Sequence, residues 1–286
     1  MTKVRHITFG TPGYTTSVQQ LQSTATEFGI NTYAYTPRHP AVLELRRRSP
    51  DIMRQRHGGG YWLWKPTIIL DALNHSEEGT VVMYTDSAMH MIADPRPMLR
   101  YALSYPIMIF EHKFPPEGGP AASLTCKWTK RDTFVLLEAD TPRFWNIQQA
   151  MGGVQIYRNC QQARDFVQEL AMAMADPRVL TDLPNTQGLD NLTGYRGHRH
   201  DQSVLTIIAR KHDLPRFPDP TQFGFPHNRP AIDPSPDGIV RPEARFHNIF
   251  DIHRRRHRTL RERIVRLFRP IEPGNWSKCE VDLQLD

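Results

Sequence analysis

The chain has little cysteine and lacks any long apolar run. Its three cysteines, Cys126, Cys160 and Cys279, are far apart and form no C-x-x-C pair. This odd number at this spacing indicates neither a disulfide framework nor a zinc ribbon. No stretch approaches the roughly 20 apolar residues that span a bilayer, and the first residues lack the apolar segment of a signal peptide. We therefore expect a cytoplasmic protein whose cysteines are ordinary small apolar residues.

The excess of basic residues is concentrated near the C-terminal end of the chain. The formal net charge is +6, but residues 241–269 hold ten arginines against three acids, a net of +7 that leaves about −1 elsewhere. Apolar side chains recur there every three or four positions, which predicts a basic amphipathic helix. We expect residues 245–269 to contact an anionic membrane surface, or to pack their apolar stripe on the rest of the protein.

An arginine-rich segment would also attract nucleic acid. The aromatic residues, however, concentrate between Gly58 and Trp64, far from the arginines in sequence. This separation suits a small-molecule pocket better than a surface on which bases stack. We therefore expect no nucleic-acid partner.

Strand and helix patterns alternate along the chain. Strands are predicted at 4–9, 30–35, 80–85, 107–110, 133–137 and 153–157, and helices at 18–28, from 66 onwards, at 97–103, 161–175 and 202–211. Such alternation predicts an α/β fold with a mostly parallel or mixed sheet and helices on both faces.

Eight prolines lie between residues 214 and 242, far more densely than in the rest of the chain. Proline removes a backbone donor and disfavours both a long helix and a central strand. We therefore predict a main domain over residues 1–213, a proline-rich lid or linker over 214–242, and a basic amphipathic helix with a tail over 243–286.

A glycine-rich and aromatic segment, GGGYWLWKP, occupies residues 58–66. Three glycines permit close approach of the backbone to a ligand. Tyr61, Trp62 and Trp64 offer flat ring faces, and Lys65 offers a positive charge for a phosphate. The alternative is that the two tryptophans anchor a loop to the core.

Asp86 and Ser87 directly follow the apolar strand at 80–85. Ligands of open α/β sheets bind beyond the carboxyl ends of strands, so the Asp86 carboxylate suits a ribose or a divalent cation. A carboxylate that caps the next turn is the alternative. Gly152 and Gly153 precede another strand, where backbone amides can meet a sugar, or where a β-bulge occurs.

The segment HRHDQS, residues 198–203, opens a predicted helix. A helix N-terminus favours negative charge, and Asp201 suits a base or a group that orients a sugar. His198 or His200 could bind a metal together with Asp86. The alternatives are a helix-capping aspartate and two surface histidines.

Taken together, five segments resemble a group of bacterial and viral glycosyltransferases with the GT-A fold, associated with surface polysaccharide synthesis. The resemblance covers roughly residues 4–213, and its first and last segments are the specific ones. The five segments are GGGYWLWKP (58–66), VVMYTDSA (81–88), CKWTKRD (126–132), MGGVQIY (151–157) and HRHDQSVL (198–205).

The resemblance implies a Rossmann-like domain that binds a nucleotide sugar, with UDP-sugars favoured. A hexose would pass to a glycan or lipid-linked glycan, with retention slightly favoured by analogy. It implies catalytic roles for Asp201 and Gln202. The implied donor-binding residues are Phe9, Gly10, Tyr61, Trp64, Lys65, Asp86, Ser87, Gly152 and Gly153.

In the resemblance, Asp86 takes the first position of an Asp-x-Asp signature, and Ala88 stands in place of the second acid. A divalent cation, Mn²⁺ or Mg²⁺, would then need Asp86 with His198 or His200. Without a cation, a basic residue would have to offset the phosphate charge, and the candidates are Lys65, Lys127, Lys130 and Arg131. Ala88 also leaves open a non-catalytic GT-A domain that binds carbohydrate.

Overall fold

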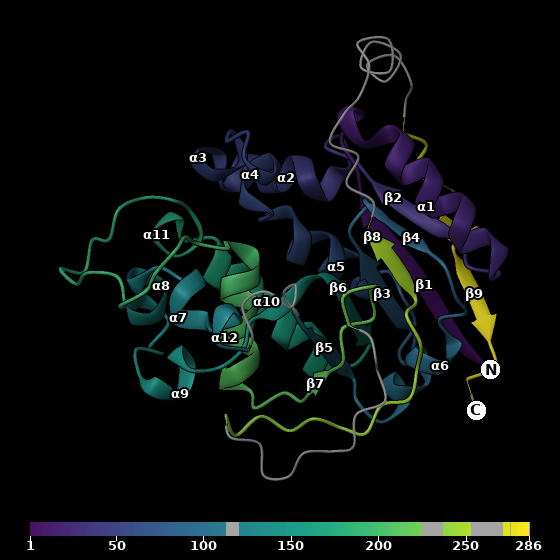
Figure 1. Ribbon diagram of the computed structural model, residues 1–286. Coiled ribbons are helices and arrows are strands. Elements are labelled where there is room, and N and C mark those ends of the chain that lie inside the picture. The colour runs from purple at the N-terminus through teal and green to yellow at the C-terminus, as the bar shows by residue number, and fades with distance from the viewer. Residues whose placement is uncertain (113–119, 225–236, 253–270, 275, 286) are drawn as a thin grey trace.

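The computed structural model describes residues 1–112, 120–224, 237–252, 271–274 and 276–285. Its centre is a seven-stranded mixed sheet in the order β2-β1-β3-β6-β5-β7, with β9 also paired to β1 (Figure 1). Strands β6 and β9 run antiparallel to their neighbours, and the other pairs are parallel. A short sheet joins β4 to β8. The strands are β1 (Thr2–Phe9), β2 (Thr32–Tyr35), β3 (Val81–Thr85), β4 (Met89–Met91), β5 (Ile107–Glu111), β6 (Ala150–Arg158), β7 (Arg216–Phe217), β8 (Phe250–Ile252) and β9 (Glu280–Leu283).

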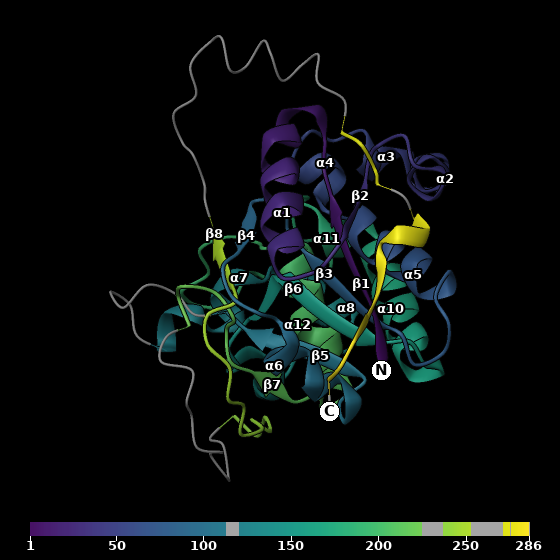
Figure 2. The same cartoon turned by 90° about the vertical axis from the view of Figure 1, so that its right-hand side faces the viewer.

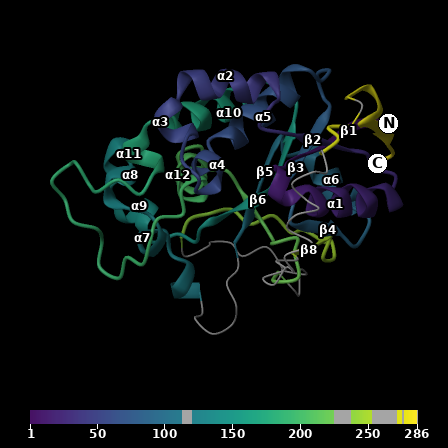
Figure 3. The same cartoon turned by 90° about the horizontal axis from the view of Figure 1, so that it is seen from above.

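Helices cover both faces of this sheet, which confirms the predicted fold class. Figure 3 shows α2, α5 and α10 on one side of the strands and α1, β4 and β8 on the other. The longer helices are α1 (Thr15–Glu27), α2 (Pro40–Arg48), α5 (Trp64–Asn74), α8 (Arg131–Leu136), α10 (Gln161–Met174) and α12 (Asp201–Lys211). The four-residue helices are α3 (Pro50–Met53), α4 (Gly58–Tyr61), α6 (Arg96–Leu99), α7 (Thr125–Trp128), α9 (Pro142–Trp145) and α11 (Pro177–Leu180). The 3-10 turns are η1 (Pro12–Tyr14), η2 (Arg100–Leu103), η4 (Pro120–Ser123) and η5 (Trp276–Lys278).

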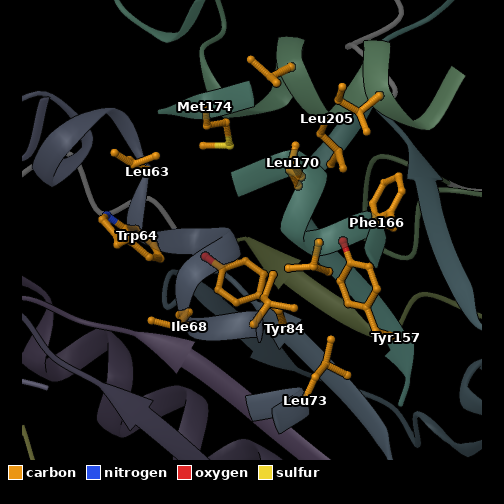
Figure 4. Close-up of a cluster of buried hydrophobic side chains, with 14 of the residues drawn as sticks. Leu63, Trp64, Ile68, Leu73, Tyr84, Tyr157, Phe166, Leu170, Met174 and Leu205 are labelled. Carbon is orange, nitrogen blue, oxygen red and sulfur yellow. The ribbon is translucent and has the colours of Figure 1, made fainter. Parts of the chain in front are cut away.

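Side-chain alternation along the strands divides the core into two layers. In β3, Val82 and Tyr84 face the layer under α5, α10 and α12, whereas Val81 and Met83 face the opposite layer. This is the period of two expected for a strand buried on both faces. Figure 4 shows the first layer, in which Tyr84 lies between the side chains of α5 and those of β6 and α10. The site described below lies at one end of this layer.

Most of the predicted strands and helices are present in the structure, but one predicted strand is wrong. Residues 133–137 were predicted as a strand, but residues 131–136 form the helix α8. A short apolar run has no periodicity that separates a strand from a buried helix. Here Thr133 donates from its hydroxyl to the Val179 carbonyl at 2.8 Å, and Phe134 is buried against Ile207 of α12. Tertiary packing therefore determines the helix.

The sheet continues beyond the predicted boundary after residue 213. Strand β7 pairs with β5, and β9 pairs with the first half of β1, so both ends of the described chain lie at the same sheet (Figure 2). The predicted amphipathic helix falls mostly on residues 253–270, outside the described residues. Its first residues, up to Ile252, are not helical: Phe246 and Ile249 are buried in the second layer, and Phe250–Ile252 form β8. None of the described helices is long and apolar enough to cross a membrane.

His6 occupies the centre of the sheet and is fully buried. Its ring nitrogens each lie 2.8 Å from a hydroxyl, one of Thr32 on β2 and one of Thr85 on β3. Burial lowers the pKa of His6 from 6.5 to about 3. The neutral ring thus joins three neighbouring strands.

We predict that this histidine makes stability depend on acidity. Because its pKa is lowered on folding, its contribution is fully present above pH 6.5 and is lost as the pH falls from 6.5 towards 3. Between pH 7.5 and pH 5 the loss should be about 2 kcal/mol, at roughly 1.4 kcal/mol per pH unit below 6.5. Urea denaturation of wild type and His6→Gln at both values measures it. The same pH dependence in both proteins would contradict the assignment.

Candidate functional site

The candidate site lies where β1 and β3 end and β6 begins. Because β6 runs antiparallel to β3, its first residues lie beside the end of β3, with Val154 opposite Thr85. Asp86 follows β3, and its backbone N–H donates to the carbonyl of Gly153 at 2.8 Å. This is the edge at which open α/β sheets bind ligands. The DSA and GGV segments of the sequence therefore meet here.

A buried lysine joins a third and a fourth segment to this edge. Lys65 Nζ lies 2.5 Å from Oδ2 of Asp201 and 3.5 Å from Oδ1 of Asp86. It also donates to the carbonyl of Gly152 at 3.0 Å. Lys65 belongs to the first turn of α5 and Asp201 to the first residue of α12. We call Lys65, Asp86 and Asp201 the charge cluster.

The charge cluster is open to solvent at one of its members. The side chains of Lys65 and Asp201 are 4% and 12% exposed, whereas that of Asp86 is 41% exposed. An unpaired charge at the depth of Lys65 would be strongly unfavourable. A ligand approaching from solvent therefore meets Asp86 first, and the ion pair lies behind it.

Burial and charge act in opposite directions on the pKa values of the ion pair. Burial lowers the pKa of Lys65, but the charges of Asp201 and Asp86 outweigh it, so the pKa of Lys65 is raised. Burial raises the pKa of Asp201, and Lys65 opposes this without cancelling it. The lysine therefore stays an ammonium, and the Asp201 carboxylate is a stronger base than an exposed aspartate.

Tyr84 holds the third member of the cluster. Its hydroxyl donates to Oδ1 of Asp86 at 2.6 Å, and burial raises the pKa of Tyr84 well above 10, so the hydroxyl remains a donor. The sequence pattern alone assigns no role to Tyr84. Residues two apart on a strand point to the same face, and this spacing from Asp86 is the signal that could have identified it.

The glycine pair of β6 lies directly against the carboxylates. A Cβ atom on Gly152 would lie 3.1 Å from Oδ2 of Asp201, and one on Gly153 would lie 3.1 Å from Oδ2 of Asp86. Contacts this short force a neighbour to move. Glycine at both positions therefore keeps the two acids in place and leaves backbone groups uncovered beside them.

The segment before Lys65, labelled α4 (Gly58–Tyr61), is a left-handed turn and not a regular right-handed helix. Five successive residues have positive φ: Gly58 (55°), Gly59 (60°), Gly60 (101°), Tyr61 (52°) and Trp62 (60°). For residues with a side chain this conformation costs roughly 1–2 kcal/mol each, and such strain gathers at functional sites. The backbone freedom predicted for the three glycines agrees with this turn. The turn ends at Trp62, just before α5, which carries Lys65.

Four rings from this turn and from HRHDQS meet beside Asp201. The ring of His200 lies 4.9 Å from that of His57, 4.8 Å from that of Tyr61 and 5.7 Å from that of Trp62. His200 also has a positive φ of 49°. We call these four residues the aromatic cluster. His57 is exposed, and Tyr61 and Trp62 are half-buried, so the cluster borders solvent.

Asp182 lies at the rim of the aromatic cluster and had no part in the sequence interpretation. Tyr61 donates from its hydroxyl to Oδ2 of Asp182 at 3.3 Å, and Nε2 of His200 lies 3.8 Å from its Oδ1. Asp182 is separated from both partners in sequence, and no motif marks it. Only the three-dimensional structure identifies this contact.

Phe9 and Trp64 stack on each other with ring centroids 3.9 Å apart. Both are buried, and the indole N–H of Trp64 donates to the carbonyl of Gly58 at 3.0 Å. Trp64 therefore anchors the left-handed turn to the core. Gly10 is enclosed too: a Cβ there would lie 2.7 Å from Cδ1 of Ile271.

Two further predicted residues are the chain neighbours of Asp86 and Asp201. Ser87 is buried in the turn that follows Asp86. Gln202 donates to Oε1 of Gln149 at 2.9 Å, and Gln149 in turn donates to the hydroxyl of Thr129 at 3.1 Å. Gln149, which the sequence interpretation missed, thus ties the start of α12 to the segment before the glycine pair.

Two of the other basic candidates, Lys130 and Arg131, have partners outside the charge cluster. Lys130 donates from Nζ to the carbonyl of Leu183 at 2.8 Å, and Arg131 pairs with Asp140 at 2.9 Å. Among the four basic residues named from the sequence, Lys65 is the one that the structure shows in contact with both Asp86 and Asp201.

Among the described residues, the structure does not group the predicted metal ligands Asp86, His198 and His200. His198 is buried, with Nε2 3.0 Å from the Val179 carbonyl and Nδ1 3.4 Å from the Lys130 backbone nitrogen. Since Nε2–H donates and Nδ1 accepts, the ring keeps no lone pair for a metal. Within the described ranges no three His, Cys, Asp or Glu side chains are grouped to hold a metal ion. The position between Asp86 and Asp201 holds the Lys65 ammonium.

No protein-family model matches the sequence, and no curated protein matches it. A solved structure of mouse xyloside xylosyltransferase 1 in its apo form matches with a TM-score of 0.42 and 11% identity. The match covers 87% of this chain and 97% of that chain. At this level the likeness assigns no residue, substrate or partner to the chain.

We predict a strong energetic coupling between Lys65 and Asp201. Lys65→Met should destabilise the protein by about 3–5 kcal/mol, because Asp201 would be left buried without its partner. In an Asp201→Asn background the same change should cost about 1–3 kcal/mol less. Urea denaturation of wild type, both single variants and the double variant measures the coupling.

Lys130→Met is the matched control for this cycle, because it removes another buried ammonium whose contact is a carbonyl. Its effect should add to that of Asp201→Asn. Simple additivity for Lys65 and Asp201 would show that the ion pair contributes nothing of its own.

Proposed function

We propose that this protein is a glycosyltransferase that moves a hexose from a nucleoside-diphosphate sugar, with UDP-sugars favoured, to a glycan or lipid-linked glycan. The observation that carries the proposal is the charge cluster beside the glycine pair, at the ligand-binding edge of a mixed α/β sheet. The resemblance of five sequence segments to GT-A glycosyltransferases supports it, because four of them supply this edge.

A transferase must hold the donor sugar against a carboxylate. The missing side chains of Gly152 and Gly153 leave the backbone of β6 open next to Asp86 and Asp201. We place the donor sugar over this glycine pair, with its hydroxyls within reach of Asp86, the most exposed acid of the cluster. The ribose and diphosphate then lie along the ends of β1 and β3.

Asp201 is our candidate for the catalytic carboxylate. Its raised pKa makes it a better proton acceptor than a surface aspartate. The Lys65 N–H group directs Oδ2, and the glycine pair limits its movement, so the carboxylate is held before a substrate arrives. In a retaining mechanism the carboxylate lies beside the anomeric carbon, where Asp201 would stabilise the positive charge that develops on the sugar.

The aromatic cluster is our candidate for the acceptor side. It borders Asp201 through the adjacent His200, and its rings offer flat apolar faces with a carboxylate, Asp182, at the rim. A sugar ring combines apolar C–H faces with hydroxyls at its edge, so this combination suits a glycan. Surface polysaccharide synthesis, a cytoplasmic location and contact of residues 245–269 with an anionic membrane remain proposals from the sequence.

A panel of nucleotide sugars tests the donor class. We expect a UDP-sugar at about 100 times its Kd to stabilise the protein by about 2.7 kcal/mol and to raise its Tm by roughly 5 °C. CMP-, GDP- and dTDP-sugars should shift it less. Differential scanning fluorimetry in the presence of EDTA and of Mn²⁺ measures the shift.

Two glycine variants provide the control for this panel. Gly152→Val places a side chain against Asp201 and should abolish the shift, whereas Gly197→Val meets nothing within 4 Å and should keep it. No shift with any nucleotide sugar would overturn the proposed function.

Removing either carboxylate should slow transfer strongly, and urea denaturation of each variant checks that it is folded. We expect Asp201→Asn and Asp86→Asn to lower kcat by about 10²-fold or more, because each acts on charge or protons in the transition state. Asp213→Asn is the matched control, because Asp213 lies just beyond the other end of α12 and is 62% exposed. Release of the free nucleotide measures turnover. Normal turnover in both site variants would rule out the assignment.

A further inference from the structure

Three oxygen atoms surround the Lys65 ammonium as ligands surround a metal ion. Asp201 Oδ2, the Gly152 carbonyl and Asp86 Oδ1 lie 2.5, 3.0 and 3.5 Å from Nζ. Carboxylates and backbone carbonyls are the ligands that hard divalent cations prefer. The donor set thus has the chemistry of a cation site, and the protein's own side chain occupies it.

We propose that Lys65 replaces the divalent cation of this site, so that nucleotide binding needs no metal. The proposal rests on the proposed function for its ligand, a nucleoside diphosphate, but not for its geometry. The proposal concerns the cation between Asp86 and Asp201, and it does not depend on which sugar is transferred.

The surroundings of Lys65 keep its charge in place. The side chain is 4% exposed and enters the site from the first turn of α5, whose orientation is set by burial of Trp64, Ile68 and Ile69. A second cation between Asp86 and Asp201 would lie within a few ångströms of this ammonium, where like charges repel strongly. The lysine therefore excludes the metal as well as replacing it.

The contact of the ammonium with Asp86 is the longest of its three. Two of its three N–H groups serve Asp201 and Gly152 at hydrogen-bond distance. The third faces Asp86 at 3.5 Å, beyond a strong hydrogen bond. Because Asp86 already accepts from Tyr84 at 2.6 Å, it does not depend on the lysine for a partner. A phosphate oxygen of the donor can take this third N–H, which supplies positive charge where the leaving diphosphate needs it.

Ala88 fits the same interpretation. In the resemblance it stands where the second acid of the Asp-x-Asp signature is expected, and β4 begins directly after it. A lysine between two carboxylates already balances one of their charges. A third acid at position 88 would add negative charge beside the diphosphate with no metal to offset it.

Manganese titration of the unliganded protein tests the proposal, because free Mn²⁺ is read directly by electron paramagnetic resonance. Wild type should not take up one Mn²⁺ per chain. Lys65→Ala removes the ammonium and leaves the three oxygens, and it should bind Mn²⁺ about tenfold more tightly or better. Adding Asp86→Asn to Lys65→Ala should abolish this gain. Lys130→Ala, which removes a buried ammonium elsewhere, should behave as wild type.

Two outcomes of this titration would overturn the proposal. One is stoichiometric Mn²⁺ uptake by wild type that Asp86→Asn abolishes. The other is a folded Lys65→Ala protein that gains no Mn²⁺ binding. If Lys65→Ala fails to fold, the wild-type titration and the calorimetry with UDP described next still test the proposal, because a metal can bind alone or together with the diphosphate.

Calorimetry with UDP as the probe extends the test to the liganded protein. The affinity of wild type for UDP should agree within about twofold in EDTA and in Mn²⁺, and a gain of about tenfold with Mn²⁺ would overturn the proposal. If UDP does not bind at all, the donor assignment of the proposed function fails. The manganese titration needs no nucleotide, so the two failures are distinguishable.

Discussion

The ion pair between Lys65 and Asp201 is the interaction on which the site depends. It joins the first turn of α5 to the first residue of α12, two helices that cover the same face of the sheet. A buried ion pair adds little to stability, because desolvation offsets most of the attraction. Its effect is geometric: it sets the distance between two helix starts and directs both at the glycine pair of β6.

Backbone strain is concentrated directly before both members of this pair. Trp62 lies three residues before Lys65, and His200 one residue before Asp201, and both have positive φ. Their rings stack on each other, 5.7 Å apart and tilted by 25°. Aromatic contacts contribute roughly 0.5–1.5 kcal/mol, which offsets part of the backbone cost. The strained segments are thus held by one another, and a change in either alters the geometry of the ion pair.

Sequence patterns could predict the sheet and the end of β3, but not which buried side chains meet at the site. Thr80–Thr85 is apolar on nearly every residue, so a buried strand ending at Asp86 follows from composition. The identity of the partner of Asp86 does not follow, because Lys65 meets it only after the left-handed turn places the first turn of α5 at the glycine pair of β6. His198 was also predicted as a metal ligand, but its ring forms a hydrogen bond with the backbone carbonyl of Val179 in α11. No local sequence pattern predicts this contact. Residues 133–137 were misassigned since a five-residue apolar run fits a strand as well as a helix.

The pairing of β9 with β1 has a consequence for how the chain folds. Thr2 lies opposite Leu283, so two neighbouring strands are separated by roughly 280 residues of sequence. Contacts between such distant residues slow folding, since much of the chain must be ordered before they form. During synthesis, the outer edge of β1 at Thr2–Arg5 stays unpaired until residues 280–283 have left the ribosome. An open strand edge invites pairing with other chains, so the newly made protein is vulnerable to aggregation until its sheet is complete.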